Sequence, residues 1–504
     1  MTQNILCPTK QQLDFLDWEL GLFFHFGIRT FFPTHRDWDG KSMPVTAFHP
    51  TSLDVEQWVT TAKKAGCRYA ILTCKHHDGF CNWPSRFSNY TVAQTPWEHG
   101  QGDVVRLFTD ACRRHGLRVG LYYSPAQWNA DQTQSVQTGQ QTKDESKHTT
   151  NMPKQNGKTA TTQSVMTPEE CFVAQITELL TQYGRIDYLW FDGCGTEGHV
   201  FDKTRIIRTI RNLQPDILLF HLWDPDTRWC GNEEGYCDID NQNVTDRLPL
   251  SMRTPELEEL QTTRFLPAEC DLKMRDTWFD ANNVSTVKSP QTLLGLWEYS
   301  VGRGANMLIN IGPNADGVLP SPDCDALLQF AALRREKWEK PLPFTLCDQN
   351  GAPLSQIDPV TPNVQSCDDS TILQKNETTT SSEEPSENST FSVENEKTTS
   401  VNCYLLQTSH PMPVTGICLW EDLQKGQRIA SFRIEIQTEN GRNICIYESK
   451  SIGHRRVCLF PLVVTDRFLI FTHGALGQTL RNARAYCFSK DNDLTLSDNT
   501  GSEK

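Results

Sequence analysis

The stretch IDYLWFDGCG, residues 186–195, decides the fold that the sequence predicts. Its apolar run, residues 188–191, ends abruptly at Asp192, which is followed by glycines. A short apolar run bounded by glycine is typical of a strand buried on both faces, as in a parallel sheet covered by helices. In α/β barrels the functional residues lie at the carboxyl ends of such strands. Asp192 is therefore either a functional carboxylate or a simple cap of the next turn.

The same pattern recurs between residues 12 and 340. Further strands are expected at residues 20–27, 69–74, 118–124, 216–221 and 307–312, with another short strand before Glu269. Amphipathic helices are expected between them; one begins at Asp54 and ends at Gly66, and another begins with the capping box at residues 167–170. About eight alternations of strand and helix predict an α/β fold, a (β/α)8 TIM-like barrel or a distorted relative of it.

Two segments of biased composition divide the chain. Residues from about 129 to 166 and from about 364 to 401 are rich in Thr, Ser, Gln, Glu and Asn, and we expect both to be disordered. The first would be an insertion in a catalytic domain spanning residues 1–340, and the second would lie in a linker, residues 341–402. Short strand-like runs without helices over residues 403–490 predict a smaller all-β sandwich, followed by a disordered tail at residues 491–504.

Charge and hydropathy exclude several classes of partner. The formal net charge is −14, and no run rich in Lys or Arg occurs. Nucleic acid and anionic membrane surfaces are therefore not expected as partners. No stretch approaches the roughly 20 apolar residues of a membrane-spanning helix, so membrane insertion is not expected either.

The sequence gives opposing signals about the cellular compartment. The 18 cysteines include no CxxC pair, which favours reduced thiols and a cytoplasmic protein. The first residues lack a basic segment followed by an apolar core, so no secretory signal is expected. Sequons for N-glycosylation favour the secretory route instead; they begin at Asn89, Asn243, Asn283, Asn376 and Asn388. The compartment stays open at this point.

Polar and aromatic side chains that suit a sugar gather at the predicted strand ends and in the later loops. They are His25, His76, His77, Tyr122, Asp192, Glu233, Glu234, Glu269 and Trp278. Imidazoles and a phenol can exchange hydrogen bonds with hydroxyl groups, and an indole can cover an apolar ring face. Two carboxyl groups can provide the nucleophile and the proton donor that glycoside hydrolysis requires.

Each of these residues also has a plainer interpretation. Taken alone, His25 is as consistent with a hydrogen-bonded core histidine as with a sugar-binding residue. His76, His77 and Asp78 could ligate a metal, but adjacent strand residues face opposite sides and no HxH or HExxH spacing occurs, so no metal is expected. Glu233 and Glu234 could simply be exposed loop residues.

Several motifs together resemble glycoside hydrolase family 29, the α-L-fucosidases. They are HFG at residues 25–27, KHHDGFCNWPS at 75–85, GLYYS at 120–124, WFDG at 190–193 and LINIGPNADG at 308–317, in the order in which that family carries them. The stretches WEDLQKGQRIASF at 420–432 and SIGHRRV at 451–457 resemble the discoidin-like β-sandwich that follows the barrel in one branch of the family.

The resemblance implies a retaining hydrolase that removes terminal α-linked L-fucose from fucosylated oligosaccharides or glycoconjugates, without metal or organic cofactor. By match to WFDG, Asp192 would be the nucleophile. His25, His76, His77 and Tyr122 would hold the fucose, and Trp278 is a further candidate for substrate binding. Glu233, in the loop WCGNE at residues 229–233, would be the acid/base, with Glu269 of PAECD as the runner-up. The family resemblance suggests an extracellular or lysosomal protein.

Two other functions remain open from the sequence. A glycosidase for another sugar, such as galactose, would keep the pair of carboxyl groups but need room for a hydroxymethyl group where fucose has a methyl. A catalytically inactive, lectin-like protein would keep the fucose-binding residues without turnover.

Overall fold

The computed structural model describes residues 6–35, 41–126, 166–194, 199–249, 252, 257–280, 286–354 and 399–488. Its larger sheet contains eight parallel strands. They are β1 (Leu20–Phe24), β2 (Tyr69–Lys75), β3 (Arg118–Tyr123), β4 (Tyr188–Phe191), β5 (Leu218–Phe220), β6 (Arg228–Trp229), β9 (Ala268–Lys273) and β10 (Asn306–Asn310). The order is β5-β4-β3-β2-β1-β10-β9-β6.

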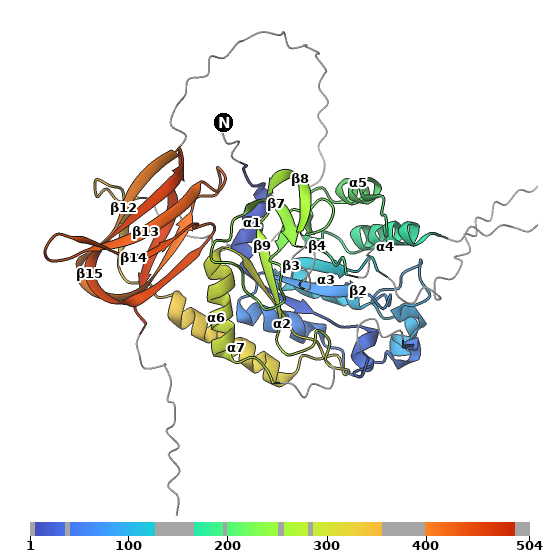
Figure 1. The fold of residues 1–504 in the computed structure, drawn as a ribbon. Helices are drawn as coiled ribbons and strands as arrows, with labels where there is room; N and C mark the ends of the chain where they lie inside the picture. Colours follow the sequence, from blue (N-terminus) through green and yellow to red (C-terminus); the bar gives the residue numbers. More distant parts are fainter. Residues whose placement is uncertain are drawn as a thin grey trace, which may run out of the picture.

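The two edge strands of this sheet approach each other. Phe220 of β5 forms a parallel bridge with Thr227, which directly precedes β6. The sheet is therefore a nearly closed barrel, which confirms the predicted TIM-like fold (Figure 1).

Helices pack around the barrel, and all of them except α1 share its largest hydrophobic cluster; Phe15 and Trp18 of α1 belong instead to the aromatic cluster inside the barrel. They are α1 (Lys10–Trp18), α2 (Val55–Ala65), α3 (Val104–Arg114), α4 (Pro168–Gln182), α5 (Lys203–Leu213), α6 (Pro290–Ser300) and α7 (Ser321–Trp338). The predicted boundaries of α2 are confirmed: the Asp54 side chain caps its first turn, and Gly66 ends it in the left-handed conformation, with φ of 85°.

The alternation of strand and helix is less regular than the sequence predicted. Among the described residues, no helix lies between β5 and β6 or between β6 and β9. Instead β7 (Val244–Pro249) and β8 (Leu257–Phe265) form an antiparallel pair. The segment from 224 to 249 is rich in Gly, Asp and Asn and has no apolar period of 3.6, so it cannot present an apolar stripe to the barrel.

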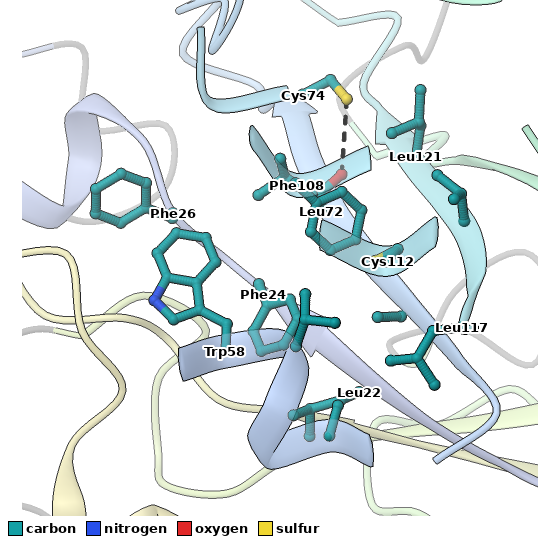
Figure 2. Close-up of a cluster of buried hydrophobic side chains, with 14 of the residues drawn as sticks. Leu22, Phe24, Phe26, Trp58, Leu72, Cys74, Phe108, Cys112, Leu117 and Leu121 are labelled. Atoms are coloured by element: carbon teal, nitrogen blue, oxygen red, sulfur yellow. Dashed lines mark hydrogen bonds between the residues drawn. The ribbon is translucent and has the colours of Figure 1, made fainter. Parts of the chain in front are cut away.

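The uniform apolar character of β1 has a clear cause. Phe23 belongs to the aromatic cluster inside the barrel, whereas Leu22 and Phe24 belong to the outer core. Figure 2 shows Phe24 beside Trp58 of α2, and the Phe24 and Trp58 rings are 5.5 Å apart. Because both faces of the strand are covered, neither set of alternating positions is polar.

The C-terminal part forms a separate antiparallel sheet around its own hydrophobic cluster. Its strands are β11 (Thr345–Cys347), β12 (Thr399–Glu421), β13 (Ile429–Gln437), β14 (Asn443–Ser449), β15 (Arg456–Ala475) and β16 (Leu480–Tyr486). The long strands β12 and β15 pair with each other along most of their length, with register shifts that bend the sheet. The predicted β-sandwich is thus confirmed (Figure 1).

Several predicted segments lie wholly or largely outside the described residues. The insertion at 129–166 is outside apart from Met166, and the tail at 491–504 is outside completely. The biased stretch at 364–401 is outside except for its last three residues, which begin β12. Within the predicted linker at 341–402, β11 pairs with β12, so part of that interval belongs to the sheet. The described helices include none long and apolar enough to cross a lipid bilayer.

A largely but not fully buried ion pair joins the β-sandwich to the barrel. Arg455 donates to Glu19, with the Nη2 to Oε1 distance at 2.8 Å. Glu19 directly precedes β1, and the guanidinium of Arg455 lies 5.2 Å from the centroid of the Trp297 ring and 5.0 Å from that of the Trp420 ring. Burial alone would raise the pKa of Glu19, but Arg455 and His454 outweigh it and lower the pKa to about 2.

This ion pair predicts a pH-dependent contribution to stability. Because the pKa of Glu19 falls from 4.5 to about 2 on folding, the contribution is present above pH 4.5 and is lost as the pH falls towards 2. We expect Glu19→Gln to lower the free energy of unfolding at pH 7 by about 3 kcal/mol. The difference from wild type should shrink steadily between pH 4.5 and 3, as measured by urea unfolding.

Glu336→Gln, a change at an exposed glutamate of α7, is the matched control. It should leave the free energy of unfolding unchanged at pH 3 and at pH 7. A destabilisation by Glu19→Gln of the same size at pH 3 and pH 7 would contradict the role assigned to the ion pair.

Candidate active site

The side chain of Asp192 lies where the period of β4 directs it. Tyr188 and Trp190 belong to the aromatic cluster inside the barrel. Side chains of a strand alternate between its two faces, so Asp192 continues this inward row just past the carboxyl end of β4. This is the end of a barrel strand at which catalytic residues are expected.

Three groups from different elements hold the Asp192 carboxylate. The Tyr122 hydroxyl donates to Oδ2 at 2.8 Å, and the backbone N–H of Cys194 donates to Oδ1 at 2.9 Å. His77 Nε2 lies 3.4 Å from Oδ2. Burial would raise the pKa of Asp192, but His77 and these hydrogen bonds outweigh burial and place the pKa below its usual range. Asp192 is therefore an ionised carboxylate at neutral pH.

His77 is oriented by Ser124, the last residue of the GLYYS motif, for which no role was predicted from the sequence. Ser124 directly follows β3 and is fully buried, with its Oγ 2.6 Å from Nδ1 of His77. This hydrogen bond fixes the ring so that Nε2 faces Asp192. Tyr122 and Ser124, the third and fifth residues of the GLYYS motif, therefore act on the same carboxylate, one directly and one through His77.

His76 and His25 are buried imidazoles beside Tyr122. The ring of His76 stacks on that of Tyr122 with centroids 5.6 Å apart, and the His25 ring lies 5.7 Å from His76. Burial lowers the pKa of His25 to about 3 and that of His76 well below its usual value, so both rings are neutral at pH 7. Nδ1 of His76 is buried and has no hydrogen-bond partner among the described residues. Its hydrogen-bonding capacity is not used within these residues.

Asn310 connects His25 to Trp278. Its side-chain N–H donates to the carbonyl oxygen of Trp278 at 2.7 Å, and its Oδ1 accepts from Nδ1 of His25 at 2.7 Å. Nε2 of His25 is therefore the nitrogen without the proton and can accept a hydrogen bond. The Trp278 indole lies 4.8 Å from the His25 ring. Trp278 thus adjoins the predicted histidines although it comes from a loop more than 250 residues away.

Glu233 joins the same group of residues through Lys273, the last residue of β9. The Lys273 ammonium donates to Oε2 of Glu233 at 2.7 Å and lies 5.0 Å from the centroid of the Trp278 ring. A continuous series of contacts therefore runs from Asp192 through Tyr122 and the histidines to Trp278, Lys273 and Glu233. The structure brings the predicted residues, other than Glu269, to one end of the barrel.

Glu269, the second candidate for the acid/base, lies in a different layer. It accepts hydrogen bonds from Tyr69 at 2.5 Å, from Trp190 Nε1 at 2.9 Å and from Tyr188 at 3.3 Å. Tyr69 and Tyr188 are the first residues of β2 and β4, so this carboxyl group lies towards the amino ends of the strands. It is fully buried, and burial raises its pKa to about 7. Its contacts are those of a structural carboxyl group inside the barrel.

Asp271 and Lys273 were not singled out from the sequence. Asp271 accepts from the Trp229 indole N–H at 2.7 Å, and burial together with the charge of Glu233 raises its pKa well above the usual value. A signal existed: Glu269, Asp271 and Lys273 recur with a period of two in one strand. Ionisable residues are rarely buried without a reason, so three of them on the inward face of one barrel strand indicate a functional site.

One group of side chains near Asp192 has the chemistry of metal ligands. His77, Asp192 and Cys194 each offer a ligand atom, and these atoms all lie within 4.8 Å of one another. The hydrolysis of a glycoside requires no metal, so the group is not needed for that reaction.

Comparison with known proteins places this geometry in a family. The model of the family described as alpha-L-fucosidase matches residues 44–335. "Alpha-L-fucosidase 1" of Arabidopsis thaliana is 30% identical over 481 residues, covering 92% of this chain and 83% of that protein. A protein of Oryza sativa subsp. japonica is 30% identical over 475 residues, covering 92% of this chain and 81% of its own.

Solved structures agree in fold. A glycoside hydrolase 29 family member from an unknown rumen bacterium has a TM-score of 0.70 at 24% identity, covering 97% of this chain and 79% of that one. A fucosidase of Ruminococcus gnavus, solved in complex with fucose, has a TM-score of 0.73 at 21% identity, covering 96% of both chains. At these identities the two structures show the fold alone. Because the family model spans more than half of the sequence and the two plant relatives match it almost from end to end, the chain belongs to the alpha-L-fucosidase family, glycoside hydrolase family 29.

Proposed function

We propose that this chain is a retaining exo-α-L-fucosidase that acts on fucosylated oligosaccharides or glycoconjugates, with Asp192 as nucleophile and Glu233 as acid/base. The observation that carries the proposal is the environment of Asp192, an ionised carboxylate at the carboxyl end of a barrel strand. Neutral imidazoles with hydrogen-bonding capacity to spare lie beside it. The identity of the sugar, L-fucose, is inferred from membership of the alpha-L-fucosidase family.

In the first step, a carboxylate oxygen of Asp192 attacks the anomeric carbon of the fucose and forms a covalent β-fucosyl-enzyme. Glu233 gives a proton to the departing glycosidic oxygen. Lys273 donates to Oε2 of Glu233, which leaves Oε1 to carry that proton. The Tyr122 hydrogen bond and His77 hold the attacking group in place.

In the second step, Glu233 takes a proton from water as the water attacks the same carbon from the α face. Asp192 leaves, and the product is α-L-fucose, with the configuration retained. His25, His76 and His77 bind the sugar hydroxyl groups, and the indole of Trp278 covers an apolar part of the ring.

We also propose that the β-sandwich is the discoidin-like domain of this branch. The two stretches that carry the resemblance lie at the junction with the barrel. From the first, Gln427 Oε1 accepts from the backbone N–H of Asn243; from the second, Ser451 donates to the carbonyl oxygen of Asn241, and Arg455 binds Glu19. These contacts support a domain that packs on the barrel and supports the loop after Glu233, on the leaving-group side.

Azide rescue tests the two catalytic assignments separately. With an activated aryl α-L-fucoside, we expect Asp192→Gly to lose rate by on the order of 10⁴-fold and Glu233→Ala by ~10²–10⁴-fold. Azide added to Asp192→Gly attacks the substrate once, so the product should be β-L-fucosyl azide. Azide added to Glu233→Ala attacks the covalent intermediate, so the product should be α-L-fucosyl azide, which proton NMR distinguishes from the β anomer.

Glu234→Ala is the matched control for Glu233→Ala, because Glu234 is the neighbouring exposed glutamate of the same loop. It should keep the wild-type rate. Full activity of Asp192→Gly would overturn the mechanism, and the same azide anomer from both variants would overturn the assignment of roles. Turnover of the matched galactoside instead of the fucoside would favour a different glycosidase, and binding of fucose without turnover of any glycoside would favour the lectin-like alternative.

Glu269 provides a second test, because the structure surrounds it with donors. Glu269→Gln can still accept from Trp190 and donate to Tyr69, so we expect activity to stay within several-fold of wild type. Glu269→Ala leaves these buried donors unpaired and should lower the free energy of unfolding by about 3 kcal/mol. A loss of activity in Glu269→Gln as large as that in Glu233→Gln would instead make Glu269 the acid/base.

The pH dependence of Glu269→Gln has a predicted sign. Because folding raises the pKa of Glu269 from 4.5 to about 7, ionising it weakens the folded state as the pH rises through this interval. Wild type should lose up to about 3 kcal/mol between pH 4.5 and 8 from this group, and Glu269→Gln should not. The stability difference between the two proteins, measured by urea unfolding at pH 5 and pH 8, isolates the effect.

A further inference from the structure

Cys194 brings a thiol to the proposed nucleophile for which hydrolysis has no use. Its backbone N–H donates to Asp192, a contact that any residue except proline could make. Its side chain is exposed, and Sγ lies within 4.8 Å of ligand atoms of both Asp192 and His77. Among the residues that the structure describes, His77, Asp192 and Cys194 are the group of histidine, cysteine and acidic side chains close enough together to share one metal ion.

The three ligand types together select a particular class of cation. A thiolate and an imidazole are ligands for Zn²⁺ and its soft neighbours, whereas Mg²⁺ and Ca²⁺ bind oxygen atoms. Three protein ligands with one open position are the usual coordination of accessible zinc sites. Zinc bonds of roughly 2.0–2.3 Å in a tetrahedral site place ligand atoms about 3.3–3.8 Å apart, so the present separations need only small side-chain movements.

The ligands are also held from behind. Ser124 Oγ lies 2.6 Å from Nδ1 of His77, which turns Nε2 towards Asp192, and Tyr122 donates to Oδ2 of Asp192. Hydrogen bonds on the far side of metal-binding histidines and carboxylates fix their orientation in the same way. Little conformational freedom remains to be lost when a cation binds, except at Cys194.

We propose that His77, Asp192 and Cys194 form an inhibitory binding site for Zn²⁺ and other thiophilic divalent cations. The cation takes Nε2 of His77, in the tautomer that carries its proton on Nδ1 and donates it to Ser124 Oγ, together with a carboxylate oxygen of Asp192 and the Cys194 thiolate; the thiol proton leaves to solvent. A carboxylate oxygen that binds the cation cannot attack an anomeric carbon, so the cation and the fucoside exclude each other. The inhibition rests on the proposed function, whereas the binding does not.

Cobalt(II) tests the binding without reference to activity. Titration of the full chain with Co²⁺ should produce the near-ultraviolet thiolate-to-cobalt charge-transfer band together with the visible bands of a tetrahedral site. Cys194→Ser should lose the charge-transfer band. Cys445→Ser, a change at an exposed cysteine of β14, is the matched control and should keep it. A wild-type band that survives in Cys194→Ser, or no band in wild type, overturns the site.

Kinetics with Zn²⁺ then test the inhibition. Each variant is compared with itself, as the ratio of its rates with Zn²⁺ and with chelator, so a change in its basal activity does not matter. We expect Cys194→Ser to raise the half-inhibitory Zn²⁺ concentration at least tenfold, Cys445→Ser to leave it unchanged, and added L-fucose to protect wild type. Unchanged inhibition of Cys194→Ser overturns the proposal. A cobalt band without any fucosidase activity would instead overturn the proposed function alone.

Discussion

The two-residue period of strands buried on both faces determines which side chains can meet at the carboxyl end of this barrel. Phe23 faces the barrel interior, so His25, two residues later, faces the same way. Trp190 also faces the interior, and so does Asp192, two residues after it. The covering helices require the alternate positions to be apolar as well. A shift of one residue in either strand would exchange a catalytic candidate for a core side chain.

Local charge gives two carboxyl groups of this barrel different properties. Asp192, whose side chain is 26% exposed, and the fully buried Glu269 both accept hydrogen bonds, yet the pKa of Asp192 is lowered and that of Glu269 is raised to about 7. Asp192 has an imidazole at 3.4 Å and backbone and phenol donors. The partners of Glu269 are two phenols and an indole. Hydrogen bonds from neutral donors do not offset the free-energy cost of burying the charge of Glu269, so its pKa is raised. Of these two carboxyl groups, Asp192 is therefore the one suited to be a nucleophile at neutral pH.

Much of this arrangement could be predicted from the sequence, because a polar residue at the end of a buried strand can be recognised by the apolar run before it. His25, His76, Tyr122 and Asp192 each terminate or follow an apolar run, so a barrel topology brings them together. The family was predicted from ordered motifs and is confirmed by comparison with its members. The position of Trp278 beside His25 could not be derived from the period of a strand, since it depends on the loop that follows β9 and on its hydrogen bond to Asn310.

Other features gave weaker signals in the sequence. The short strand β6 has two residues and no helix before it, so neither its apolar content nor its spacing distinguished it from a loop. Lys273 looks like a strand-terminal surface lysine until Glu233 is placed beside it, and that pairing joins residues 40 apart across a strand and a loop. Long-range pairs of this kind depend on tertiary structure, whereas the capping box at Thr167 depends on four consecutive residues and was predicted correctly.

The junction with the β-sandwich bears on the barrel as a whole through β1. Glu19, at the start of this strand, binds Arg455, and His25, just past its end, binds Asn310 of the neighbouring strand β10. Trp338 of α7 packs against Tyr486 of β16 with ring centroids 5.0 Å apart, within the same hydrophobic cluster as the outer faces of the barrel strands. Removing the sandwich would expose that indole and leave Glu19 without its guanidinium partner at the base of the strand that positions His25. The sandwich is therefore an integral part of the barrel's packing, since the interactions that attach it are continuous with the core from which the proposed active site is built.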